Sequence, residues 1–279
     1  MVETWEERRA AVEGAGLGFT AAEEYRMFPP PEPDSADGQH AAEAARALLP
    51  LIEEMRPHVC VSDILTLAPA LAAEVAGVPL ATLVPHIYPV VEPGQPFFAI
   101  GLRTPRTGLG RAAWRAGQRA LDVGLEHGRR DLNLQRQRLG LPPLLRFHGG
   151  ISPDLALVGT YPQLEYPRHW PAGVEVTGPM SFEVPHPTID LPPGDRPLIL
   201  VAPSTAHDSD NHLVRTALIA LAEEPVRVVA TTNRVVPQHP IEVPTNAVLV
   251  DWLSYGQLMP AASLVVSHGG HGTVARALG

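Results

Sequence analysis

A glycine-rich turn near residue 270 is the stretch of this sequence best suited to binding chemistry. Its six residues, HGGHGT (268–273), follow the apolar run SLVVS and precede the helix-forming run VARALG. Glycine lets a backbone approach a ligand closely, and the first turn of a helix offers free N–H groups and a partial positive charge. The turn therefore suits a phosphate group, with backbone amides and the Thr273 hydroxyl, which can also cap the helix, as donors.

Two other interpretations of this turn stay open on spacing alone. His268 and His271 are three residues apart, as two metal ligands can be, but a zinc site needs further ligands, and the sequence has neither an HExxH motif nor a cysteine pair. We therefore expect no metal. The turn is also neither GxGxxG nor a P-loop, so it could be a glycine-rich strand–helix connection without a ligand.

Alternating strand and helix patterns predict how such residues are positioned. Before a proline-rich stretch at 182–197, the pattern indicates strands at 58–64, 78–85, 155–160 and 174–178, with helices at 67–77 and 111–140. After it, strands are expected at 197–203, 226–232, 247–252 and 263–268, with helices at 212–224, 255–262 and from 273. This predicts an α/β protein with two doubly wound domains, at 1–180 and 197–279, joined by a linker at 181–196.

Ligands of doubly wound sheets bind at the carboxyl ends of the parallel strands. The residues at those ends are therefore the candidates for function. They are Asp63, Pro203, Ser204, Thr205, Trp252 and the turn 268–273.

Composition excludes several classes of protein. The formal net charge is −9 and no basic stripe is present, so we expect no nucleic-acid partner. No apolar run is long enough to span a membrane, and the charged start MVETWEERR is unlike a signal peptide. A single cysteine, Cys60, fits a reducing compartment. We expect a globular cytoplasmic protein.

Two stretches carry a resemblance to a known family. DWLSYGQLMPAASLVVSHGGHGTVARALG (251–279) resembles the donor-binding segment of GT-B fold glycosyltransferases, which use nucleotide sugars. RPHVCVSDILTLAPALAAEVAGVPLATLVP (56–85) is similar to the strand, helix and strand around that family's N-domain aspartate. With weaker likeness at 131–143 and 151–180, the resemblance covers nearly the whole chain. It implies two Rossmann-like domains of GT-B type, the first for the acceptor and the second for the nucleotide sugar.

The resemblance implies a set of donor-binding residues. His268 and the amides of Gly270, Gly272 and Thr273 would contact the diphosphate, and Trp252, followed by Leu253, would stack on the nucleobase. Two further residues, Ser204 and Thr205, would lie near the phosphates. Trp252 could instead be an aromatic residue of the core near a strand end.

The resemblance also implies a catalytic role for Asp63. In the family this aspartate orients a histidine, which takes the proton of the acceptor hydroxyl as it attacks the anomeric carbon. Asp63 could instead be the N-cap of the following helix. The loops at 26–40 and 86–110 would line the acceptor pocket, through residues that include His86, Tyr88, Phe97 and Phe98.

The sequence departs from the family at three places. The catalytic histidine belongs to an earlier strand, and we expect no Rossmann strand before Trp5. The family's later Asp-Gln pair is not found, and its Pro-Gln after the tryptophan is Ser254-Tyr255 here. The chain therefore resembles a glycosyltransferase truncated at both ends.

We expect an inverting glycosyltransferase that moves a sugar from a UDP or TDP donor to a hydroxyl of a lipophilic small molecule, without a cofactor. The 279 residues alone would turn over near background. Robust turnover would make His86 and His58 the first candidates for the base. A non-catalytic nucleotide-sugar-binding remnant is the alternative, and a GT-B fold epimerase is a further one.

Overall fold

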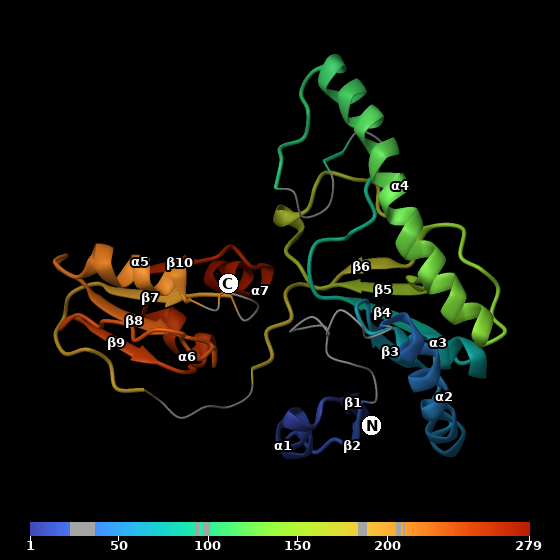
Figure 1. Cartoon of the computed structure of the whole chain (residues 1–279), viewed down its shortest axis with the longest axis horizontal. Coiled ribbons are helices and arrows are strands. Elements are labelled where there is room, and N and C mark those ends of the chain that lie inside the picture. The colour runs from blue at the N-terminus through green and yellow to red at the C-terminus, as the bar shows by residue number, and fades with distance from the viewer. Residues whose placement is uncertain (23–36, 93–94, 97–100, 184–188, 205–207, 209) are drawn as a thin grey trace. The chain divides into compact units, whose positions relative to one another are not determined.

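The protein is described by a computed structural model over residues 1–22, 37–92, 95–96, 101–183, 189–204, 208 and 210–279. Its chain divides into two compact units (Figure 1). One comprises Met1–Arg9 and Leu17–Pro179, and the other comprises Ala10–Gly16 and Met180–Gly279. No helix in these ranges is long and apolar enough to cross a membrane.

The first unit is built on a four-stranded parallel sheet in the order β3-β4-β5-β6 (Figure 1). The strands are β3 (Cys60–Asp63), β4 (Leu80–Val84), β5 (Leu155–Val158) and β6 (Val174–Val176). Its helices are α2 (Asp37–Met55), α3 (Leu67–Ala76) and α4 (Gly108–Arg138). Short 3₁₀ turns lie at η2 (Phe147–Gly150) and η3 (Pro162–Leu164).

Small side chains allow α2 and α3 to pack closely against each other. Ala41, Ala44 and Ala45 of α2 are buried against Ala68 and other residues of α3. The helix α3 ends at Gly77, whose φ of 65° is the left-handed conformation that glycine adopts without strain. This cap turns the chain directly into β4, so the predicted strand–helix–strand unit is confirmed.

The first residues of the chain form a small sheet of their own. A short strand, β1 (Val2–Thr4), precedes Trp5 and pairs in parallel with β2 (Phe19–Ala21), in a two-stranded sheet separate from β3–β6. Between them lie η1 (Glu6–Arg8) and α1 (Arg9–Gly14). Within the described residues, the only strand before Trp5 is therefore β1, which pairs with β2 and is not part of the main sheet β3–β6.

The predicted loops at 26–40 and 86–110 are also shorter than expected. α2 already begins at Asp37, and residues 23–36 lie outside the described ranges. α4 begins at Gly108, where the Thr107 hydroxyl accepts a hydrogen bond from the Gly110 N–H (3.0 Å). This N-cap extends the helix three residues before its predicted start.

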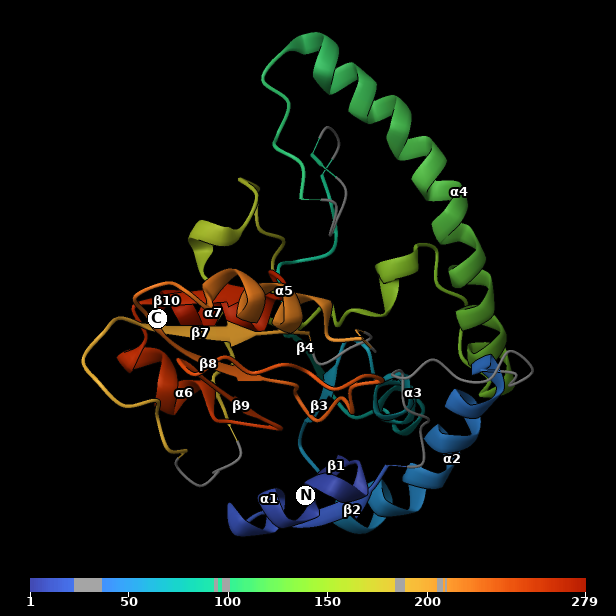
Figure 2. The same cartoon turned by 60° about the vertical axis from the view of Figure 1, so that its left-hand side comes forward.

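The second unit has a parallel sheet in the order β10-β7-β8-β9 (Figures 1 and 2). The strands are β7 (Leu198–Ala202), β8 (Arg227–Thr231), β9 (Ala247–Val250) and β10 (Leu264–Ser267). The helix α5 (His212–Leu221) connects β7 to β8. The helix α6 (Tyr255–Leu258) and the turn η4 (Met259–Ala261) connect β9 to β10, and α7 (His271–Leu278) follows β10.

Successive side chains of β7 point to opposite faces of the sheet, and both faces are covered. Leu198 and Leu200 pack with Leu253, Tyr255 and other residues around α6. Ile199 and Val201 point to the opposite face and pack with α5 residues such as Val214. Because both faces are buried, the carboxyl edge of the sheet is where polar groups can meet a ligand.

Candidate functional site

The glycine turn joins β10 to α7 and holds its first histidine in a defined position. Gly269 has a φ of 82°, and its N–H donates to the Ser267 hydroxyl (3.2 Å). The His268 side chain folds over Gly270, where an added Cβ would lie 2.2 Å from His268 Nε2. Only glycine at position 270 therefore leaves room for this placement of the exposed imidazole.

The helix after the turn begins two residues earlier than predicted. Gly270 is the N-cap of α7, and Thr273 is the third helical residue. Thr273 was therefore wrongly expected to cap the helix, and its side chain is buried. The amides of the first turn, including those of Gly272 and Thr273, still belong to the set without intrahelical acceptors. Across the described ranges, no group of three or more His, Cys, Asp or Glu side chains could hold a metal ion.

Trp252 follows β9 and lies half-buried beneath an arginine. The Arg234 guanidinium carbon is 4.7 Å from the centre of the Trp252 ring, a cation–π stack. The neighbouring Leu253 is buried in the core under β7. Leu253 thus contributes to packing through its side chain, whereas Trp252 lies at the edge of the sheet.

The turn after β8 is a polar network that the sequence analysis missed. Asn233 is buried, and its side-chain amide donates to the Pro203 carbonyl (2.8 Å) while its Oδ1 accepts from the Tyr255 hydroxyl (3.1 Å). The Arg234 N–H donates to the Asp251 carbonyl (2.8 Å). These bonds connect the carboxyl ends of β7, β8 and β9. An Asn directly after a predicted strand was the available signal, because Asn adopts left-handed turns more readily than most residues.

The residues that replace the family's Pro-Gln have structural partners here. The Ser254 hydroxyl donates to Glu183 Oε2 (2.6 Å), and Ser254 is the N-cap of α6. Glu183 also pairs with Arg276 of α7 (2.6 Å). Of the two predicted phosphate neighbours, Ser204 lies half-buried just beyond β7, and Thr205 is outside the described residues.

Asp63 ends β3 in the first unit and forms a local turn. Its Oδ1 accepts the Leu65 N–H (2.8 Å), while the N-cap of α3 is Thr66. Asp63 is therefore not the N-cap of that helix. Burial raises the pKa of the Asp63 carboxyl above its usual value, against the opposing effects of the Leu65 N–H and of His86.

His86 stands at the matching end of the neighbouring strand. Asp63 pairs with Leu83 in the β3–β4 register, and His86 follows three residues later. His86 Nδ1 is 2.8 Å from the Ile87 carbonyl oxygen, which can only accept. A neutral His86 therefore carries its proton on Nδ1 and has Nε2 as the unprotonated nitrogen.

Two further histidines, His148 and His58, lie in different places relative to this end of the sheet. Burial, followed by the charge of His86, lowers the pKa of His148 in η2. His58 is exposed and precedes β3, so it lies at the amino end of the strand, away from Asp63. The charge of His86 thus acts both on the Asp63 carboxyl and on the His148 imidazole in the first unit.

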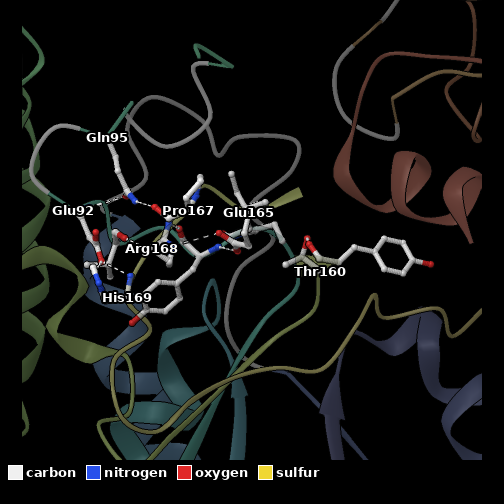
Figure 3. Close-up of polar contacts among 12 residues, drawn as sticks. Glu92, Gln95, Thr160, Glu165, Pro167, Arg168 and His169 are labelled. Atoms are coloured by element: carbon white, nitrogen blue, oxygen red, sulfur yellow. Dashed lines mark hydrogen bonds and ion pairs between the residues drawn. The ribbon is translucent and has the colours of Figure 1, made fainter. Parts of the chain in front are cut away.

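The segment after β4 is held by a buried ion pair (Figure 3). The Glu165 and Arg168 side chains are 3% and 2% exposed, and Arg168 Nε is 3.5 Å from Glu165 Oε2. Glu165 Oε1 accepts the Tyr88 N–H (2.6 Å), and Arg168 donates to the Val90 carbonyl (2.6 Å). The chain after β4 is therefore fixed by groups some 77 to 78 residues later in the sequence.

Aromatic and amide groups extend this cluster. The Arg168 guanidinium lies 5.3 Å from the ring centres of both Tyr88 and Trp170. Gln95 donates to the Pro167 carbonyl (2.8 Å) and accepts the Glu92 N–H (2.9 Å) (Figure 3). Tyr88 was predicted to contact an acceptor, and the structure places it in this cluster at 6% exposure. The other predicted contacts, Phe97 and Phe98, lie outside the described residues.

Comparison with known proteins relates the chain to glycosyltransferases. No protein-family model matches the chain. 4'-Demethylrebeccamycin synthase from Lentzea aerocolonigenes is 31% identical over 250 residues, which are 85% of this chain and 58% of that protein. The chain is a homologue of GT-B fold glycosyltransferases. It spans about half the length, or less, of the curated relatives it matches.

Solved structures establish the same fold. The glycotransferase of kitacinnamycin superposes with a TM-score of 0.69 at 19% identity, over 99% of this chain and 69% of the other. The glycosyltransferase VinC, solved in complex with dTDP, gives a TM-score of 0.58 at 18% identity, over 98% of this chain and 70% of the other. The predicted α/β fold of GT-B type is therefore confirmed.

Proposed function

We propose that the second unit of this glycosyltransferase homologue binds a UDP or TDP sugar at the carboxyl edge of its sheet. The observation that carries the proposal is the turn at 268–273, in which Gly269 and Gly270 position His268 shortly before the first-turn amides of Gly272 and Thr273. VinC is similar in fold and was solved with dTDP, which supports a nucleoside diphosphate as the ligand.

In this proposal, the diphosphate binds at the turn and the base at Trp252. The first-turn amides of α7 and the His268 imidazole donate to phosphate oxygens, and the partial positive charge of the helix adds to the attraction. The base packs against the half-buried Trp252, beside the Arg234 guanidinium that already lies over part of its ring. Ser204, beyond β7, lies between these two places in the sheet order.

The transfer itself is an inverting displacement at the anomeric carbon. A hydroxyl oxygen of a lipophilic acceptor bonds to that carbon as the bond to the nucleoside diphosphate breaks, and a neutral histidine takes the hydroxyl proton. A carboxylate beside the histidine stabilises the imidazolium that forms. Asp63 is the proposed carboxylate, and His86, whose charge acts on it, is the first candidate base within this sequence.

The acceptor site is proposed at the segment after β4. The Glu165–Arg168 pair fixes the backbone at Tyr88 and Val90, so that this segment has one conformation before an acceptor arrives. Preorganisation of this kind lowers the cost of binding. The buried Tyr88 adds packing that keeps this segment in place.

A titration with UDP, TDP and their sugars tests the donor site directly. Saturable stabilisation against thermal unfolding is expected for the diphosphates and their sugars, and none for the matching nucleosides at equal concentration. Equal responses to nucleoside and diphosphate would contradict a phosphate-binding turn. Binding without sugar release or transfer would favour the alternative of a non-catalytic nucleotide-sugar-binding protein. Background turnover by the 279 residues stays a prediction.

A further inference from the structure

We infer that Arg234 selects the donor nucleotide, by donating hydrogen bonds to the carbonyl oxygens of a pyrimidine base stacked at Trp252. This inference rests on the proposed donor site and adds a residue to it. Its three supports are the position of Arg234 in the sheet, its stacked guanidinium and the strained turn that holds it.

The order of the strands separates two ends of the proposed donor site. Trp252 follows β9 and Arg234 follows β8, whereas the glycine turn follows β10 at the opposite edge of the sheet. Adjacent strands lie about 4.8 Å apart, so β8 is about 10 Å and β9 about 14 Å from β10. A nucleotide with its diphosphate at the glycine turn can therefore place its base, but not its phosphates, at Arg234.

The guanidinium of Arg234 is already oriented for this contact. It is exposed and stacked 4.7 Å from the centre of the Trp252 ring. This contact holds beside the indole a group that has five N–H donors and no acceptor. Uracil and thymine both present two carbonyl acceptors at their edges, which match such donors.

The backbone that carries Arg234 is strained and firmly held. Asn233 and Arg234 have φ values of 50° and 64°, in the left-handed region that non-glycine residues seldom adopt. The turn is kept by the bonds from Asn233 to Pro203 and Tyr255, and from the Arg234 N–H to Asp251. Strain of this kind persists where the surroundings enforce it, and it often marks a binding site.

The residues after Trp252 are engaged elsewhere. Ser254 bonds to Glu183, and Tyr255 is buried with its hydroxyl on Asn233. Tyr255 thus supports the turn that presents Arg234. Recognition of the base edge accordingly falls to Arg234.

Calorimetric titration of UDP, TDP and inorganic pyrophosphate into Arg234→Met tests the inference. We expect affinity for UDP and TDP to fall about tenfold or more, the cost of a lost charge-assisted hydrogen bond, and affinity for pyrophosphate to stay unchanged. Arg196→Met is the matched control, because Arg196 is exposed at the amino end of β7. It should leave the affinity for all three unchanged.

A second variant separates binding from folding. Arg234→Gly keeps the left-handed turn without strain, so its midpoint of thermal unfolding should equal or exceed that of the wild type. Its affinity for UDP and TDP should fall as in Arg234→Met. Unchanged nucleotide affinity in both variants would overturn the role of Arg234 alone. Equal losses for nucleotide and pyrophosphate would show a phosphate contact instead, and absence of any binding by the wild type would overturn the donor site as well.

Discussion

The carboxyl edges of the two sheets differ in what they offer a ligand. In the second unit the edge presents exposed groups, namely His268 over a glycine turn and Arg234 over Trp252. In the first unit it presents half-buried titratable groups around Asp63, beside a segment fixed by the buried Glu165–Arg168 pair. An exposed edge with the first-turn amides of Gly272 and Thr273 suits an anionic ligand that arrives from water. A half-buried carboxyl next to an imidazole suits proton transfer.

This difference predicts that substitutions in the two units have separate consequences. Those in the first unit should change folding stability and its pH dependence. Those in the second unit should change nucleotide affinity with little effect on stability.

Loss of the buried cation in the first unit should have the largest effect. Arg168→Met leaves Glu165 as an uncompensated buried charge, so we expect the free energy of unfolding to fall by about 3–5 kcal/mol. Urea unfolding measures the change. Arg130→Met is the control, because its side chain is 72% exposed beside Glu126 and such pairs contribute at most about 1 kcal/mol. Equal losses in both variants would show that the buried pair does not hold the segment after β4.

Removal of the exposed imidazole in the second unit should weaken nucleotide binding. For His268→Ala we expect UDP and TDP affinity to fall by roughly 1.5–3 kcal/mol, about 10- to 150-fold, with folding stability little changed. Calorimetry measures the affinity. His127→Ala, on the exposed side of α4, should behave as the wild type. An unchanged dissociation constant for His268→Ala would remove this residue from the diphosphate site.

A methyl group at position 270 should displace the same imidazole. Gly270→Ala introduces a Cβ where His268 Nε2 lies 2.2 Å away, so the ring must move and affinity for TDP should fall severalfold. In a His268→Ala background, the same change should cost much less, because the ring it displaces is gone. Additive losses in this double-mutant cycle would show that Gly270 acts through its own backbone rather than through His268.

The smallest effect concerns the pH dependence of stability in the first unit. Burial raises the pKa of Asp63 above its usual 3.8, so the folded state prefers the protonated carboxyl. The wild type therefore loses stability as the pH rises from 3.8 through the raised pKa, whereas Asp63→Asn does not. Urea unfolding between pH 3.5 and 7 should show the variant gaining stability relative to the wild type. A relative loss over this range would mean that the folded state favours the charged carboxylate.

Local pattern was enough to predict most of the strands and helices. β7, for example, is the apolar run 197–203 between prolines, and its burial on both faces makes it unmistakable. The whole of α2 was missed, in part because it begins within a proline-rich stretch, and β1 because it is only three residues long. Their existence depends on partners, α3 and β2, that the local sequence does not identify.

Candidate site residues could be named from the sequence where a motif is contiguous. The turn 268–273 and Trp252 fall within one stretch of the sequence. The Asn233 network and the Glu165–Arg168 cluster were not predictable, because each joins segments from tens of residues apart through side-chain contacts. Such contacts exist only once the sheets have formed.

Hydrogen exchange with and without TDP or UDP tests the central claim most directly, namely that the second unit binds a nucleoside diphosphate along its sheet edge. We expect slower exchange at 252–254 and 268–274 on nucleotide binding, and unchanged exchange at 60–64 and 80–92 in the first unit. Protection should disappear in His268→Ala at the same nucleotide concentration. Unaltered exchange at 268–274 under saturating nucleotide, or protection confined to the first unit, would contradict the account.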